Sequence, residues 1–176
     1  MRFFDTHAHL NDESFDTDRA ALIEGLPSCG AELIMDVACA AEDFEKTLEI
    51  TAEYPFIYGA YGIHPHYASD PGENWEARLR RALCDKKAAC LGEIGLDYHY
   101  DLSEKEDQKK LFDYQLKLAK ELGFPVSLHI REAFGDAMEI LRANKDGLRG
   151  VMHCFSGSVE TALLLDVDFE AGEAGT

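Results

Sequence analysis

Basic residues are scarce in this sequence, which has 17 lysines and arginines against 34 aspartates and glutamates and a formal net charge of −17. A chain with this balance lacks the broad basic surface that holds a phosphate backbone by releasing counterions. If the substrate is a phosphodiester, bound cations must therefore supply much of the positive charge. The excess of acid is otherwise typical of a solubilising surface.

The sequence also lacks the marks of an exported or membrane-bound protein. Its five cysteines are odd in number, irregularly spaced and without a C-x-x-C pair, which predicts reduced, mostly structural thiols. The N-terminal residues have no extended apolar segment of the signal-peptide kind, and no apolar run approaches the roughly 20 residues of a membrane span. We therefore expect a cytoplasmic protein with no membrane partner.

Apolar residues are plentiful, and they fall into alternating strand-like and helix-like segments. The 176 residues are 46% hydrophobic, which suits one globular domain over residues 1–176, and no repeat or linker divides them. Strands are expected over residues 3–7, 32–38, 56–62, 88–98, 125–131 and 150–155, with a seventh in 168–176. Helices are expected over residues 18–26, 41–54, 75–83, 103–122, 133–144 and 159–165. Ser103 and Glu106 predict a capping box at the start of the fourth helix.

This alternation predicts an α/β protein with a parallel sheet and helical crossovers. Two architectures fit such a sheet, a doubly wound open sheet and a TIM-like (β/α) barrel. No glycine-rich phosphate loop follows the first strand, which weakens the nucleotide-binding interpretation. Polar residues stand instead at the carboxyl ends of most of the expected strands, where a barrel places its active site. We therefore favour the barrel.

Two histidines end the first expected strand. Residues two apart on a strand point the same way, so Asp5, His7 and His9 are expected on one face. Two neutral imidazoles that converge on one point make half of a metal site. The alternative is a pair of solvated histidines near the chain start.

Three later strands end in similar chemistry. Glu93 stands between Gly92 and Gly95, an arrangement that suits a ligand needing close backbone approach. His129 and Arg131 share the polar face of the fifth strand, and His153 ends the sixth. Cys154 would point away from His153, so we interpret it as a buried thiol rather than a nucleophile.

The combined set fits one or two divalent ions, with Glu93 as a bridge between them. Two such ions can activate a water and stabilise both oxygens of a displacement at phosphorus. A histidine-rich set with one carboxylate accepts zinc, manganese or, less readily, magnesium. The predicted ligands are His7, His9, Glu93, His129 and His153.

From Met1 to about Gly157 the sequence resembles the TatD family of metal-dependent deoxyribonucleases. The resemblance rests on five motifs in the family's order: Asp5–Leu10, Gly62–Pro65, Gly92–Tyr98, Pro125–Arg131 and His153–Gly157. It implies a TIM-like barrel, two divalent metal ions, and hydrolysis of DNA phosphodiesters, often from a strand end. It also implies the five ligands named above and a role for His64 near the scissile phosphate. Arg131 is our own candidate for holding phosphate.

The final residues depart from the family. Family members continue to an eighth strand, whose aspartate completes the metal site. Here residues 165–176 align with the seventh strand, and Asp168, Glu170 and Glu173 interrupt what is apolar in the family. We therefore expect an incomplete barrel with about seven of eight βα units, two unpaired edge strands and impaired hydrolysis.

Three functions remain open. The first is a DNase of this family, with Glu93 and His64 in catalysis and single-stranded DNA or strand ends as substrate. The second is a small-molecule amidohydrolase on the same scaffold, which the net charge mildly favours. The third is a non-catalytic metal-binding remnant.

Overall fold

A computed structural model describes residues 1–168, whose strands form one parallel sheet in the order β1-β2-β3-β4-β5-β6. The strands are β1 (Phe3–Ala8), β2 (Ala31–Ala38), β3 (Ile57–Tyr61), β4 (Ala88–Asp97), β5 (Val126–Arg131) and β6 (Gly150–Met152). The α-helices are α1 (Arg19–Gly25), α2 (Phe44–Glu53), α3 (Trp75–Leu83), α4 (Lys105–Leu122), α5 (Phe134–Asn144) and α6 (Val159–Asp168). Short 3-10 helices are η1 (Glu13–Phe15), η2 (Leu26–Cys29), η3 (Ala41–Asp43) and η4 (Pro65–Tyr67).

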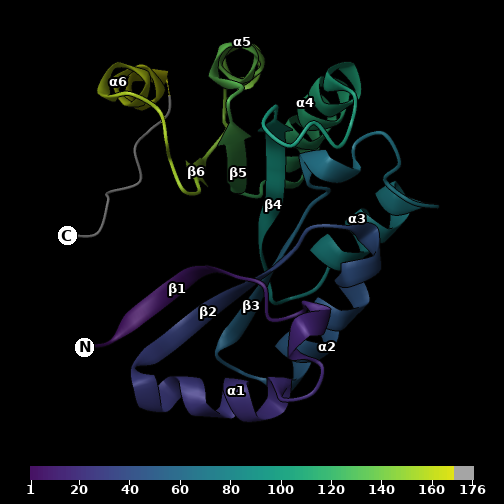
Figure 1. The fold of residues 1–176 in the computed structure, drawn as a ribbon, viewed down its shortest axis with the longest axis vertical. Coiled ribbons are helices and arrows are strands. Elements are labelled where there is room, and N and C mark those ends of the chain that lie inside the picture. Colours follow the sequence, from purple (N-terminus) through teal and green to yellow (C-terminus); the bar gives the residue numbers. More distant parts are fainter. Residues whose placement is uncertain (169–176) are drawn as a thin grey trace.

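Sequence-adjacent strands are neighbours throughout the sheet, and the sheet curls with its helices outside, as Figure 1 shows. This is a half-barrel with alternating helices, so the prediction of an incomplete TIM-like α/β fold is confirmed. No helix within residues 1–168 is long and apolar enough to cross a membrane.

The main core lies between the central strands and the helices that follow them. Leu91, Ile94 and Leu96 of β4 are fully buried there and pack with apolar side chains of α3, α4 and α5. Helix α4 ends where Gly123 takes a left-handed conformation, and the chain turns there into β5. Strand β4 therefore lies at the centre of the packed part of the molecule.

Two buried glutamines of α4 fix the carboxyl ends of β3 and β4. Gln115 accepts a hydrogen bond from the Ile63 N–H (2.8 Å) and donates one to the Ile63 carbonyl (3.0 Å). Gln108 accepts from the Asp97 N–H (2.9 Å) and donates to the Asp97 carbonyl (3.1 Å). These amides satisfy buried backbone groups just where the strand ladders end. They hold in place the segments that carry His64 and Asp97.

The predicted capping box at the start of α4 is wrong. The helix begins at Lys105, and its cap residue Glu104 makes no side-chain capping hydrogen bond. The Ser103 hydroxyl instead donates to the His66 carbonyl (2.8 Å) and accepts from the Ser69 N–H (3.1 Å). Ser103 thus joins two loops at the carboxyl edge of the sheet rather than a helix end.

The end of the described chain also differs from the expectations. Strand β6 stops at Met152, so His153 and Cys154 lie in a turn, and Cys154 has a left-handed backbone (φ 44°). Because strand alternation no longer applies there, Cys154 is exposed rather than the buried thiol we expected. Helix α6 continues to Asp168, so residues 165–168 are helical and not part of a seventh strand. The rest of that expected strand lies outside the described residues.

Candidate metal centre

Strand β1 and the residue after it carry two imidazoles to the carboxyl edge of the sheet. His9 donates from Nδ1 to the Val37 carbonyl of β2 (2.9 Å), the tautomer that leaves the Nε2 lone pair available. Asn11 donates to the same carbonyl (2.8 Å) and to the buried Asp36 carboxylate (3.1 Å). A backbone carbonyl that accepts the second nitrogen of a histidine is the usual support of a metal-ligating imidazole.

His7 supplies the test of whether these residues fit a metal. Its side chain is only 8% exposed, and neither ring nitrogen has a hydrogen-bond partner. Nε2 lies 3.3 Å from Glu93 Oε2 without hydrogen-bond geometry. A buried imidazole with both nitrogens unpaired is unfavourable unless something else binds it. With His9 and Glu93 it forms a group whose ligand atoms all lie within 4.8 Å of one another, a donor set that fits a divalent transition-type ion.

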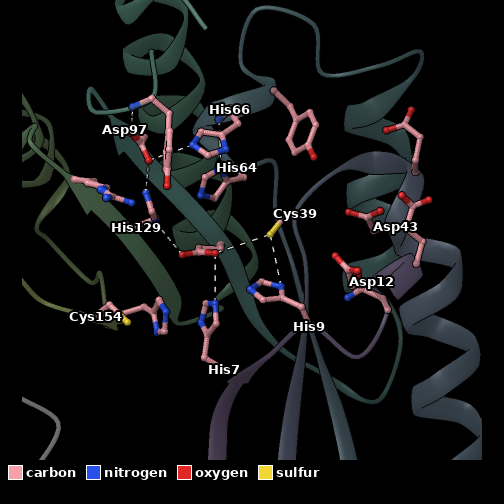
Figure 2. A pocket seen from close by; sticks show the side chains of 18 of the residues that line it. His7, His9, Asp12, Cys39, Asp43, His64, His66, Asp97, His129 and Cys154 are labelled. Carbon is pink, nitrogen blue, oxygen red and sulfur yellow. Dashed lines mark hydrogen bonds and ion pairs between the residues drawn. The ribbon is translucent and has the colours of Figure 1, made fainter. Parts of the chain in front are cut away.

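Glu93 joins this group to a second one. Its Oε1 lies 3.1 Å from His129 Nδ1, and His64, Glu93 and His129 also place ligand atoms within 4.8 Å of one another. Burial alone would raise the pKa of Glu93, but the hydrogen bond with His129 and the nearby imidazoles of His7 and His64 hold it far below its ordinary value. Figure 2 shows His7 and His9 in the lower part of the site and His64, His66 and His129 in the upper part. The carboxylate therefore faces both sets of imidazoles as an anion.

Asp97, at the end of β4, orients the second group. Its fully buried side chain lies 2.8 Å from His129 Nε2 and 3.1 Å from His66 Nε2 through Oδ2. Burial raises the pKa of Asp97, but hydrogen bonds from the Tyr100 N–H and the two histidines lower it to about 2. Burial lowers the pKa of His129, and its bonds to Glu93 and Asp97 raise it above the ordinary value. His129 thus lies between two carboxylates, with Nε2–H donating to Asp97 and Nδ1 facing Glu93, where a bound metal would take the place of the Nδ1 proton.

The remaining predicted residues are brought to the same place in different ways. His64 is buried, and burial lowers its pKa to about 3, so the ring is neutral at pH 7. His153 stacks on His7 with ring centroids 3.5 Å apart, and it belongs to neither three-residue group among the described residues. The guanidinium of Arg131 lies 4.8 Å from the centroid of the Tyr100 ring.

The glycines around Glu93 serve neighbouring strands rather than a ligand. A Cβ added at Gly92 would lie 2.8 Å from the Ser127 carbonyl oxygen of β5. A Cβ at Gly95 would collide with the His129 carbonyl oxygen, and Gly95 has a φ of +147°. The backbone at these glycines is closely approached, as expected, but the neighbour is strand β5 and not a ligand.

A pocket of about 1060 Å³ opens over these side chains, and its two sides differ in charge. One side carries the histidines, Asp97 and Arg131. The other carries acidic residues that follow β1 and β2, and Figure 2 shows Asp12 and Asp43 there, across from His129. The acidic lining residues on that side are Asp12, Glu13, Asp16, Glu42 and Asp43.

Three residues of the site were not predicted. Asp97 lies two residues after Gly95 and four after Glu93, so the strand periodicity that selected Glu93 selects it too. His66 follows His64 at the same spacing. Cys39, just after β2, has its Sγ 3.8 Å from Glu93 Oε2 and 3.9 Å from His9 Nδ1. Burial and the Glu93 charge raise the pKa of the Cys39 thiol well above its ordinary value, so it stays protonated.

The family model of the TatD related DNases matches residues 4–169. The chain belongs to this family. Among TatD-family relatives, the uncharacterized metal-dependent hydrolase YabD of Bacillus subtilis is 41% identical over 160 residues, which are 90% of this chain and 63% of YabD. The 3'-5' ssDNA/RNA exonuclease TatD of Cronobacter sakazakii is 32% identical over 90% of this chain and 61% of its own length.

Solved structures agree with this fold. The TatD homologue YJJV of Escherichia coli superposes with a TM-score of 0.87 at 34% identity, over 95% of this chain and 65% of that one. An amidohydrolase of Saccharomyces cerevisiae superposes with a TM-score of 0.78 at 20% identity, over 97% of this chain and 66% of that one, which concerns the fold alone. The chain thus spans less than two thirds of the length of YabD and of TatD.

Proposed function

We propose that this TatD-family chain hydrolyses phosphodiester bonds of single-stranded DNA or of DNA strand ends, with two divalent metal ions. The observation that carries the proposal is that two groups of potential ligands share Glu93, each compact enough for one ion. Relatives of the family carry hydrolase and nuclease names, which supports the same reaction class.

In this proposal the imidazoles on the two sides of Glu93 hold the ions. The proposed ligands are His7, His9, Glu93, His129 and His153. His64 also belongs to the second compact group, and we assign it to the substrate rather than to an ion. The bound ions would activate water and neutralise charge that develops on the phosphate oxygens. An imidazole-rich donor set suits zinc or manganese better than magnesium, which prefers oxygen ligands.

Two further residues of the pocket, His64 and Arg131, act on the substrate directly in this proposal. His64 is neutral and lines the pocket beside His129, where its ring can exchange a proton or a hydrogen bond with a phosphate oxygen or leaving group. The Arg131 guanidinium lines the same pocket, and its planar fork suits a phosphate. Asp97 does not reach the substrate in this scheme and instead holds His129 in one tautomer. We also propose the cytoplasm as the compartment, since all five cysteines are free thiols.

A small-molecule amidohydrolase is the second candidate. The acidic side of the pocket favours it, because Asp12, Glu42 and Asp43 would repel a polyanion that passes over them. A neutral or cationic amide substrate would meet no such repulsion.

The proposal is tested by cleavage of a labelled single-stranded oligonucleotide with manganese, with magnesium and with chelator. We expect metal-dependent cleavage that falls at least about 100-fold in Glu93→Gln, since the shared ligand is lost. Glu139→Gln on the exposed outer face of α5 is the matched control and should leave the rate unchanged. Folded, metal-loaded protein that cleaves esters or amides but no oligonucleotide would move the function to the amidohydrolase.

A further inference from the structure

Two exposed aromatic rings line the pocket, and the metal chemistry does not use them. Tyr67 is 45% exposed and Tyr100 is 54% exposed. Of the large exposed apolar side chains in residues 1–163, for which side-chain exposure is described, only these two line the pocket. Large aromatic side chains are more often buried than left in water, so an exposed pair at a pocket deserves a ligand-based explanation.

Tyr100 is held in a fixed relation to the metal-binding residues. Its N–H donates to Asp97 Oδ1 (2.9 Å), while Asp97 Oδ2 lies 2.8 Å from His129 Nε2. Its ring packs at right angles to His66, with centroids 5.5 Å apart, and the Arg131 guanidinium lies over it. One carboxylate therefore sets the positions of both the exposed ring and a proposed ligand.

Tyr67 is tied to the same site from the opposite loop. It ends η4, and its N–H donates to the His64 carbonyl (2.9 Å). This hydrogen bond fixes the Tyr67 backbone relative to His64. The His64 ring in turn packs against His129, with ring centroids 4.5 Å apart. The backbones of both tyrosines are thus fixed before any substrate arrives, which limits the entropy lost on binding.

The charge of the pocket decides which side a polyanion would take. Lys46 also lies on the acidic side, but it is paired with Asp16 at 3.1 Å, so the carboxylates after β1 and β2 still repel phosphates there, whereas Arg131 attracts them on the other side. A nucleic-acid strand would therefore run along the side that carries Arg131 and Tyr100. The bases would then meet the Tyr100 ring beside Arg131 and, across the pocket near Asp43 and Glu42, the Tyr67 ring. Every base has a flat face that stacks on such rings irrespective of sequence.

We infer that Tyr67 and Tyr100 form a base-stacking rim that holds the unpaired nucleobases next to the scissile phosphate, while Arg131 holds the phosphate. This inference rests on the proposed nuclease function and adds the substrate feature that the pocket recognises. The rim selects single-stranded substrates, because the faces of paired bases are covered by their neighbours in a duplex. It gives little preference among the four bases, since stacking reads no hydrogen-bond pattern.

The test compares steady-state kinetics on two single-stranded oligonucleotides, one complete and one with abasic residues at the two positions flanking the cleaved bond. For Tyr100→Ala we expect KM on the complete strand to rise by about 5- to 100-fold with little change in kcat. On the abasic strand the same variant should match the wild type, because there is no base to stack. Tyr100→Phe should restore the low KM, since it keeps the ring, and Tyr67→Ala should behave as Tyr100→Ala does.

Leu102→Ala is the control for general disturbance of this loop. Leu102 is 63% exposed, lies two residues from Tyr100 and does not line the pocket, so its loss should change neither KM. Equal KM for wild type and Tyr100→Ala on the complete strand would overturn the stacking rim and leave the nuclease function standing. A wild-type protein that cleaves neither strand would overturn the nuclease function itself, and the rim with it.

Discussion

The centre and the edges of the sheet contribute differently to the candidate metal centre. In β4 eight of ten residues are buried, whereas β1 and β6 have no buried residue in the described structure. Glu93 and His129 come from the buried centre, and His7 and His153 come from the two thinly covered edges. One half of the site is therefore held by core packing and the other by local hydrogen bonds, so the two halves should respond differently to mutation.

The largest expected effect is at Gly95 in the centre. A Cβ at this position would collide with the His129 carbonyl oxygen of β5, and the φ of +147° disfavours any L side chain. We expect Gly95→Ala to lower the free energy of unfolding by more than about 4 kcal/mol, which is the range of severe strain. Chemical denaturation with circular dichroism measures it.

Gly135→Ala in α5 is the matched control, because nothing lies within 4 Å of its added Cβ. Alanine in a helix is more favourable than glycine by roughly 0.5–1 kcal/mol, so this variant should be neutral or slightly more stable. Similar losses at both glycines would contradict the close approach of β5 to β4.

Gln115→Leu should have the next largest effect. It leaves the buried N–H and carbonyl of Ile63 without partners, and each unpaired buried group costs about 1–3 kcal/mol. We expect a loss of about 2 kcal/mol or more in the free energy of unfolding, measured by urea denaturation. Lys110→Leu, on the exposed side of the same helix, should change stability by less than about 0.5 kcal/mol. A neutral Gln115→Leu would mean that the end of β3 does not depend on α4.

Asp97, which holds His129, and Asn11, in the His9 loop, allow a direct comparison of the central half and the edge half of the site. Asp97→Asn weakens the hold on His129 Nε2, and loss of such a partner lowers metal affinity by about 10–100-fold. Asn11→Ala removes the side-chain hydrogen bonds from Asn11 to Asp36 and Val37. It leaves the Asn11 N–H bond to Asp36 and the His9–Val37 hydrogen bond, so we expect a drop in metal affinity of about tenfold or less. Zinc titration by calorimetry measures both.

Asp101→Asn is the control for removing one negative charge from the loop after β4. Asp101 is exposed and has a left-handed backbone (φ 53°) that asparagine tolerates. Its metal affinity should equal that of the wild type. If Asn11→Ala weakens zinc binding more than Asp97→Asn does, the edge half of the site dominates the affinity.

Much of the fold could be predicted because each strand and helix has a local signal. The alternation of apolar segments gave the parallel order, and polar residues at strand ends indicated the edge where the pocket lies. The role of Gln108 and Gln115 could not be read this way. In the sequence these glutamines resemble residues that face solvent. Only the tertiary fold brings the unpaired backbone groups of Ile63 and Asp97 next to their amides.

The candidate site shows the same limit. Glu93 and Asp97 are four residues apart in β4, so strand periodicity in the sequence could have identified Asp97, which orients His129. The same periodicity failed at Cys154, because β6 ends at Met152 and the turn that follows reorients the side chains. Alternation is informative only while a strand continues, and where it stops depends on tertiary packing.

The smallest expected effect is at the β1 edge. Phe4 is 48% exposed, so Phe4→Ser removes about half of the surface that a fully buried phenylalanine would lose and should lower the free energy of unfolding by about 1 kcal/mol. Leu96→Ala at the centre, where the side chain is fully buried, should cost about 2–5 kcal/mol in the same denaturation experiment. A loss above about 2 kcal/mol for Phe4→Ser would show that a surface outside residues 1–168 covers this ring in solution. Its dependence on protein concentration would then tell whether that surface is a second copy, because only association responds to dilution.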